Sequence, residues 1–140
     1  MKSQRGVITW AGRYDLLLWV LTLGRETRFR ELLLAPARLR QGENVLDVGC
    51  GTGSLAFAAK RIVGPAGKVQ GIDASQPMIS RATAKAARKH IDAHFDVASA
   101  DALPFPDRSF DVALSTVMLH HLPTATRVVG LSEMGRVLKP

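Results

Sequence analysis

A run of alternating glycines is the part of this sequence best suited to holding a ligand. The glycines directly follow the apolar run 44–48 and are Gly49, Gly51 and Gly53. Residues without a Cβ let the backbone turn tightly and let a ligand approach the main chain closely. The segment from Ser54 onward is typical of a helix, so the order is strand, glycine loop, helix. Backbone N–H groups at the start of such a helix face a ligand beyond the carboxyl end of the strand, which predicts a small-molecule site.

Asp47 indicates which kind of molecule the loop would take. It lies two residues before the first glycine, where its carboxylate would face the loop. A carboxylate there would repel a pyrophosphate but would suit a ligand that carries an ammonium group. The third glycine also comes one residue earlier than the dinucleotide pattern G-x-G-x-x-G requires, with Ser54 in the place of that glycine. Both observations argue against a nicotinamide-dependent oxidoreductase.

The pattern D-x-G-x-G-x-G over residues 47–53 resembles motif I of the class I S-adenosylmethionine-dependent methyltransferases. In that family the loop wraps the methionine end of the cofactor. The resemblance therefore implies that Asp47, the three glycines and Thr52 hold S-adenosyl-L-methionine. The reaction would be an in-line displacement at the sulfonium methyl, to which a protein contributes mainly alignment and desolvation.

A second aspartate, Asp73, closes the strand predicted over 68–73. An acidic residue at the end of the second strand of a doubly wound unit can accept hydrogen bonds from both hydroxyls of a ribose. The alternative is that Asp73 caps the helix predicted over 75–90. Met78, near the start of that helix, either covers the adenine or belongs to the core.

The loop after the third predicted strand (93–97) carries a second resemblance. Residues 101–106 read D-A-L-P-F-P and precede D-R-S-F-D, which is similar to a segment of the methyltransferases that include the quinone and sterol methylating enzymes, although this copy is shorter. The resemblance implies that Asp101 accepts the adenine amino group. It also implies that the backbone N–H of Ala102 donates to a ring nitrogen, since a backbone N–H matches a ring acceptor.

Residues at and after the fourth predicted strand (110–117) are candidates for the transfer itself. Ser115 would lie near the carboxyl end of that strand, where it could contact the methionine part of the cofactor. His120 and His121 follow, and the related family often has H-H-L near the substrate entrance. Either imidazole is a candidate general base, because its pKa lies near neutrality, and capping or packing is the open alternative. No metal-ligand spacing and no Ser-His-Asp signature occurs, so we expect no metal site and no hydrolase.

Alternating strands and helices predict a doubly wound α/β fold. We expect a Rossmann-like parallel sheet of strand order 3-2-1-4, which corresponds to the cofactor half of the class I methyltransferase fold. Helices predicted over 14–23 and 25–34 give an N-terminal helical segment (1–40) before an S-adenosylmethionine-binding domain (41–140). The apolar stretch within the first helix is too short to span a membrane and lacks a following cleavage site, so we expect neither a span nor a signal peptide.

The net charge of +7 raises the question of an anionic partner. The basic residues, Arg30 and Lys85 among them, are dispersed at helical spacing, so we expect most of them on solvent-facing surfaces. We do not expect a nucleic-acid partner, because the sequence after the fourth strand shows neither the N/D-P-P-Y/F motif nor the P-C motif of nucleic-acid methyltransferases. Peripheral membrane contact stays open. The single cysteine, Cys50, favours a reducing cytoplasm and is expected to be a small filler in the loop.

The family resemblance covers residues 14–140, and relatives normally continue beyond a V-L-K-P-G-G turn into further strands. The sequence ends at V-L-K-P, so we expect an exposed fourth strand with self-association through its edge, or a longer natural protein. The expected activity is methyl transfer to a small-molecule acceptor, inferred to be lipophilic from the apolar N-terminal run. The alternative is a non-catalytic S-adenosylmethionine-binding module.

Overall fold

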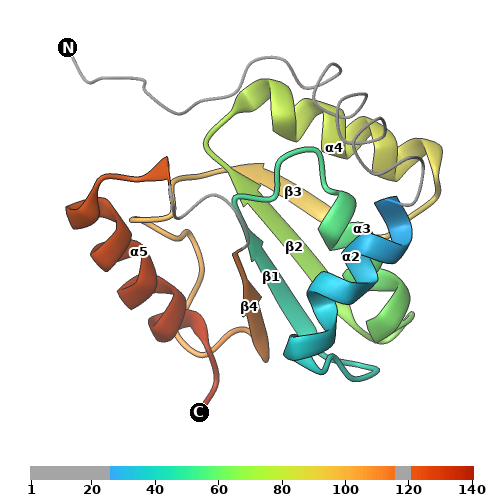
Figure 1. Cartoon of the computed structure of the whole chain (residues 1–140), viewed down its shortest axis with the longest axis horizontal. Coiled ribbons are helices and arrows are strands. Elements are labelled where there is room, and N and C mark those ends of the chain that lie inside the picture. The colour runs from blue at the N-terminus through green and yellow to red at the C-terminus, as the bar shows by residue number, and fades with distance from the viewer. Residues whose placement is uncertain (1–25, 116–120) are drawn as a thin grey trace.

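Four parallel strands form the central sheet of the computed structural model, which describes residues 26–115 and 121–140 (Figure 1). The strands are β1 (Asn44–Val48), β2 (Lys68–Asp73), β3 (His94–Val97) and β4 (Val112–Leu114). Their order across the sheet is β3-β2-β1-β4, and each pair is parallel. The predicted α/β class and strand order 3-2-1-4 are therefore confirmed.

The helices of the described residues flank this sheet. They are α2 (Glu26–Leu34), α3 (Ser54–Val63), α4 (Gln76–Arg88) and α5 (Thr124–Val137), with the short 3-10 helix η1 (Ala35–Ala37) after α2. The ends of α2 and α4 differ from the predicted ends by two residues at most. The helix predicted over 14–23 lies outside the described residues. None of the described helices is long and apolar enough to span a bilayer.

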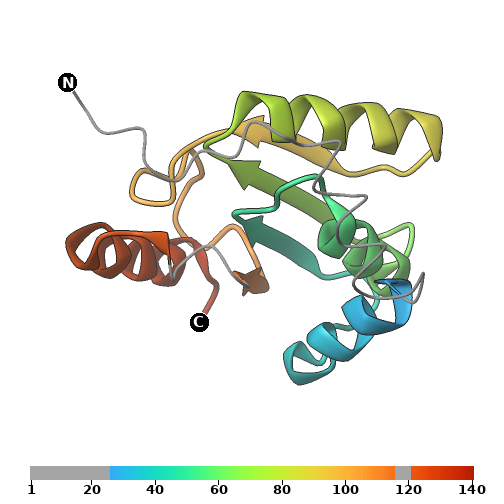
Figure 2. The ribbon, with the colours of Figure 1, turned by 45° about the horizontal axis from the view of Figure 1, so that its top comes forward.

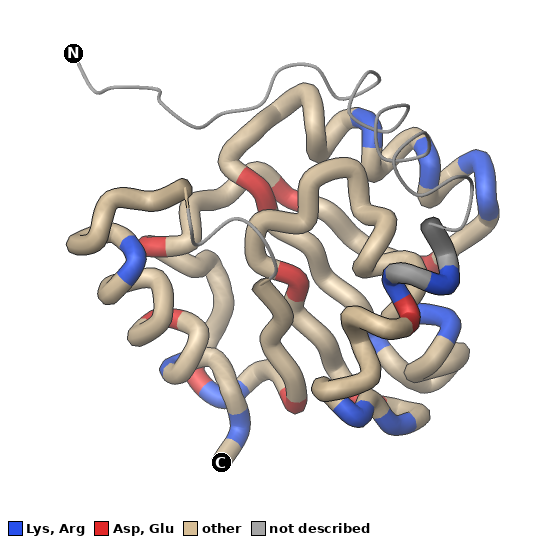
Figure 3. The backbone as a smooth tube through the Cα atoms, in the orientation of Figure 1, with Lys and Arg blue, Asp and Glu red and all other residues tan. Residues whose placement is uncertain are grey.

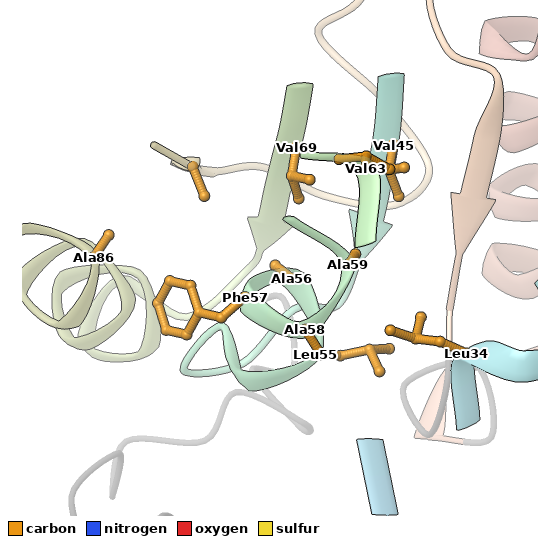
Figure 4. Packing of buried hydrophobic residues seen from close by; sticks show 11 residues of the cluster. Leu34, Val45, Leu55, Ala56, Phe57, Ala58, Ala59, Val63, Val69 and Ala86 are labelled. Carbon is orange, nitrogen blue, oxygen red and sulfur yellow. The ribbon is translucent and has the colours of Figure 1, made fainter. Parts of the chain in front are cut away.

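The two faces of the sheet carry separate cores, because alternate residues of a strand point to opposite faces. On one face, Val45 and Val69 pack in a cluster with residues of α2, α3 and α4, among them Phe57 (Figure 4). On the other face, Leu46 packs in a cluster that includes Val137 of α5. Figures 1 and 2 show α5 apart from α2 and α3, with the sheet between them. Because Asp47 has the same parity as Val45, its side chain lies on the α2–α3 face.

Phe95 of β3 explains why two glycines are required near the loop. A Cβ at Gly53 would lie 2.9 Å from the Phe95 ring, and a Cβ at Gly71 would lie 2.6 Å from it. The same Cβ at Gly71 would approach the Cys50 sulfur within 2.9 Å. Cys50 is buried, as expected of a small filler, and burial raises the pKa of its thiol, with further contributions from the charges of nearby aspartates.

β4 is shorter than predicted. The sequence predicted a strand over 110–117, whereas only Val112–Leu114 pairs with β1, and residues 116–120 lie outside the described part. Phe110 instead forms an isolated parallel bridge with Leu138, and its N–H donates to the Val137 carbonyl at 3.0 Å. Within the described residues β4 pairs with β1 alone, so it forms an edge of the sheet there.

Candidate functional site

The glycine loop joins β1 to α3 beyond the carboxyl end of β1. Gly49, Gly51 and Gly53 have φ values of 76°, 56° and 89°, which side chains with a Cβ rarely adopt. The N–H groups of Gly49 and Cys50 donate to the Ile72 carbonyl at 2.8 and 2.9 Å, so β2 holds the first half of the loop. A Cβ on Gly51 would meet nothing within 4 Å. The tip of the loop therefore borders open space.

Asp73 lies at the carboxyl end of β2 and holds the tip of the loop. Its Oδ2 accepts the Gly51 N–H at 2.9 Å, and its Oδ1 accepts the Ser75 N–H at 2.9 Å. Ser75 is the N-cap of α4, and its hydroxyl accepts the Met78 N–H at 3.4 Å, so the alternative that Asp73 caps this helix is wrong. The Asp73 carboxylate is half-buried, and a carboxylate has about four acceptor positions, so it can accept further donors.

Asp47 is a carboxyl group with an unsatisfied oxygen in the interior. The residue is 1% exposed, and its Oδ2 has no hydrogen-bond partner in the described part of the chain. Burial raises the pKa of Asp47 to about 7; the charge of Arg30 opposes this rise, and the charge of Asp73 adds to it. A buried acceptor without a donor costs free energy, so a ligand that supplies a donor here gains the bond that the protein lacks.

Ser115 presents a second such atom at the end of the neighbouring strand. Asp47 pairs in register with Leu114, so Ser115 lies one residue further toward the carboxyl ends of the strands. Its Oγ is buried and has no hydrogen-bond partner among the described residues. An unsatisfied polar atom thus belongs to a residue near the carboxyl end of each of two adjacent parallel strands. In open α/β sheets, ligands bind in this place.

The predicted adenine-binding residues lie in the loop after β3. Asp101 and Ala102 are both exposed, and the Ser99 hydroxyl is hydrogen-bonded to the Asp101 carboxylate. The N–H of Ala102, predicted to donate to a ring nitrogen, donates to the Ser99 carbonyl at 3.2 Å. A ligand would therefore have to share or replace this turn bond.

Arg136 of α5 fixes the rest of that loop. Its guanidinium donates to the carbonyls of Leu103 and Phe105 at 3.0 and 2.8 Å and to the Asp107 carboxylate at 2.7 Å. Glu133, one turn earlier, pairs with Arg136 at 2.8 Å and accepts the Leu103 N–H at 2.9 Å. The hydrogen bond from Arg136 holds the pKa of Glu133 below its usual value, with a further contribution from the Leu103 N–H. One helix thus anchors three residues of the loop.

Two basic residues near the site are exceptions to the solvent-facing placement that was expected of most basic residues. Lys85 of α4 is 7% exposed, and its Nζ donates to Thr52 Oγ1 in the glycine loop at 3.3 Å. Arg30 of α2 is half-buried and close enough to Asp47 to lower its pKa. One signal in the sequence indicated the burial of Lys85, because it lies seven residues after the buried Met78 and so shares its helix face. The other Lys and Arg positions of the described residues are spread over α2, α3, β2, α4, α5 and the connections (Figure 3).

The structure says less about the remaining predicted site residues, Met78, His120 and His121. Met78 is 1% exposed, so its side chain packs inside the fold, and its role beside an adenine stays a prediction. His121 is exposed, and His120 lies outside the described residues. Among the described residues, no group of three or more His, Cys, Asp or Glu side chains could hold a metal ion.

Known proteins are similar to this chain in both sequence and fold. A family model described as a methyltransferase domain matches residues 45–140. Demethylmenaquinone methyltransferase of Lactobacillus johnsonii is 34% identical over 132 residues, which cover 93% of this chain and 53% of the relative. A ubiquinone/menaquinone biosynthesis C-methyltransferase of Desulfotalea psychrophila is 37% identical over 130 residues, covering 93% and 51%. The chain spans about half the length of the curated relatives it matches.

A solved structure agrees with these sequence matches. The crystal structure of a SAM-dependent methyltransferase from Aquifex aeolicus has a TM-score of 0.75 and 29% identity, over 83% of this chain and 61% of that chain. The family match begins in β1 and includes the glycine loop, the whole sheet and α5. The chain therefore belongs to the S-adenosylmethionine-dependent methyltransferase domain family.

Proposed function

We propose that this chain binds S-adenosyl-L-methionine at the carboxyl ends of β1, β2 and β4, as the cofactor-binding part of a methyltransferase. The observation that carries the proposal is the pair of unsatisfied buried atoms, Asp47 Oδ2 and Ser115 Oγ, beside the glycine loop. The methionine end of the cofactor bears an ammonium group, which suits the carboxylate of Asp47. When bound, the cofactor supplies a methyl group on an already activated sulfonium.

The residues divide between the parts of the cofactor. Asp47, Ser115 and the glycine loop with Thr52 would hold the methionine end. Asp73 would accept from the ribose hydroxyls, because its half-buried carboxylate lies at the end of β2. The adenine would be held by Met78, Asp101 and Ala102. This chain would contribute orientation and exclusion of water rather than a reacting group of its own, apart from the candidate bases His120 and His121.

The proposed acceptor is a small lipophilic ring compound of the quinone type. Support comes from the names of the similar proteins, which are methyltransferases of demethylmenaquinone and of ubiquinone/menaquinone biosynthesis. A lipophilic acceptor fits peripheral contact with an anionic membrane, which the net charge of +7 favours. Self-association through the β4 edge is a separate proposal, supported by its pairing with β1 alone in the described part of the sheet.

Calorimetric titration tests the cofactor assignment. We expect the chain to bind S-adenosylmethionine and S-adenosylhomocysteine but not NAD. Asp73→Ala should lower the affinity for both sulfur compounds. Asp92→Ala is the matched control, because Asp92 is an exposed aspartate beyond the end of α4. Failure of a folded chain to bind either sulfur compound would overturn the proposal. Transfer of a labelled methyl group to a demethylmenaquinol would then distinguish an enzyme from a non-catalytic binding module.

A further inference from the structure

Lys85 is a buried cation on the face of α4 that packs toward the sheet. The residue is 7% exposed, and the buried residues that share this face include Met78, Ala82 and Ala86. A buried charge lowers stability unless neighbouring groups compensate it, and a methionine of similar volume would avoid that cost. The position of Lys85 therefore indicates a role other than packing.

The ammonium of Lys85 reaches the glycine loop from this neighbouring helix. Its Nζ donates to Thr52 Oγ1 at 3.3 Å, and Thr52 is itself 2% exposed. The same Nζ lies 5.7 Å from the centroid of the Phe57 ring, within the range of a cation–π contact. Figure 4 shows Phe57 projecting from α3 toward α4. Lys85 thus contacts the last part of the loop and the first turn of the helix that follows it.

In the hydrogen bond between Lys85 and Thr52, Lys85 is always the donor. An ammonium has three donors and no acceptor, so the Thr52 oxygen must accept. The first part of the loop is held from β2 instead, through the N–H groups of Gly49 and Gly51. Lys85 therefore acts on the part of the loop nearest to α3.

We infer that Lys85 is a positioning residue for the glycine loop. Its ammonium holds Thr52, and with it the second half of the loop, in the conformation that receives the methionine end of S-adenosylmethionine. This rests on the proposed function, because it takes the loop to be the cofactor site. A loop that is ordered before the ligand arrives loses less conformational entropy on binding, so the buried cation contributes to affinity rather than to stability.

Lys85→Met is the central test, because it removes the ammonium and keeps a flexible apolar side chain of similar length. We expect the Kd of S-adenosylhomocysteine to rise about tenfold, since a hydrogen bond from a charged donor is lost. The melting temperature of the unliganded protein should not fall. Lys89→Met is the matched control: Lys89 Nζ lies 5.8 Å over the same ring, but the residue is exposed and is the C-cap of α4. We expect it to keep the wild-type Kd.

Thr52→Val removes the acceptor and keeps the shape of the side chain. Both single changes break the same bond, so the double variant Lys85→Met/Thr52→Val should bind S-adenosylhomocysteine no more weakly than the weaker single variant. Losses that add in full would show that the two residues act independently, which would overturn the inference.

Amide hydrogen exchange of the unliganded protein separates this inference from the proposed function. Lys85→Met should speed exchange at the amides of Thr52 and Gly53 and leave those of Val45–Val48 in β1 unchanged. Equal loop exchange in variant and wild type overturns the inference, whether or not a ligand binds. Faster exchange in β1 with a lower melting temperature shows a packing role and also overturns it. A wild-type chain that binds no S-adenosylhomocysteine refutes the proposed function, and the exchange result still decides whether Lys85 holds the loop.

Discussion

Replacing Asp47 by Asn should stabilise the unliganded protein and at the same time abolish its affinity for S-adenosylmethionine. Asp47 is buried, and its pKa is raised from 3.8 to about 7. The folded state therefore binds the Asp47 proton more tightly than the unfolded state does. Stability is highest below the unfolded pKa and falls as the pH rises from about 4 to about 7, because the buried carboxyl must then either stay protonated or ionise in the interior.

The expected size follows from the separation of the two pKa values. Each pH unit between them corresponds to about 1.4 kcal/mol, so the raised pKa of Asp47 lowers the free energy of unfolding, relative to its value at low pH, by about 1.5 kcal/mol at pH 5 and about 4 kcal/mol at pH 8. Asparagine has the same shape and no charge. The free energy of unfolding of Asp47→Asn should therefore exceed that of the wild type by up to about 2.5 kcal/mol more at pH 8 than it does at pH 5.

Urea unfolding of both proteins at pH 5 and pH 8 measures this difference. Comparing the two proteins at each pH cancels the titration of every group that they share. A calorimetric titration of Asp47→Asn with S-adenosylmethionine then tests the second half of the prediction, because an amide cannot replace the charge that faces the ammonium. The reasoning is refuted if Asp47→Asn is less stable than the wild type at pH 8, or if its advantage is the same at both pH values.

The remaining predictions use other contacts of the same structure. Binding of S-adenosylmethionine near pH 7 should release protons from Asp47, because the cationic ligand favours the carboxylate; calorimetry in two buffers of different ionisation enthalpy measures this. Gly71→Ala should destabilise the fold by about 1–3 kcal/mol, since the new Cβ would lie 2.6 Å from the Phe95 ring. Gly135→Ala, whose Cβ meets nothing within 4 Å in α5, should instead raise stability by up to about 1 kcal/mol, and thermal unfolding compares the two. Arg136→Lys should weaken binding of S-adenosylmethionine and of adenosine by a similar factor, because lysine cannot reproduce the guanidinium fork that anchors the loop; unequal losses would contradict this.

The features that the sequence predicted well are those determined by local pattern and by topology. Continuous apolar runs that alternate with helices leave few arrangements other than a parallel sheet, and strand order 3-2-1-4 follows from the doubly wound connection. The sequence also placed Asp47 and Asp73 near each other, because both lie at strand ends and parallel strands bring their carboxyl ends to the same side of the sheet. The glycine spacing was informative since the loop needs positive φ at Gly49, Gly51 and Gly53.

The features that the sequence did not predict depend on contacts between distant segments. Phe110 was expected inside β4, but it pairs with Leu138, which lies 28 residues later. Arg30 appeared as one of many dispersed charges, and only the packing of α2 over the sheet brings it close to Asp47. The N–H of Ala102 was expected to be available to a ligand, whereas the turn that closes after β3 uses it. Each of these contacts depends on the path that the chain takes between two elements, and the local residue pattern does not determine that path.

Asp47 and Lys85 together distinguish a binding site from a packing defect. Both carry ionisable side chains, both are buried on the α2–α3–α4 side of the sheet, and both adjoin the glycine loop. A domain selected only to fold would be at least as stable with Asn and Met in these positions, since neither change removes buried apolar surface. When a residue that only supports the fold is replaced, the protein loses stability and its affinity for the ligand falls as well. Here we expect the opposite signs, stability kept or raised while affinity falls, and this combination identifies the two charges as groups that the ligand requires.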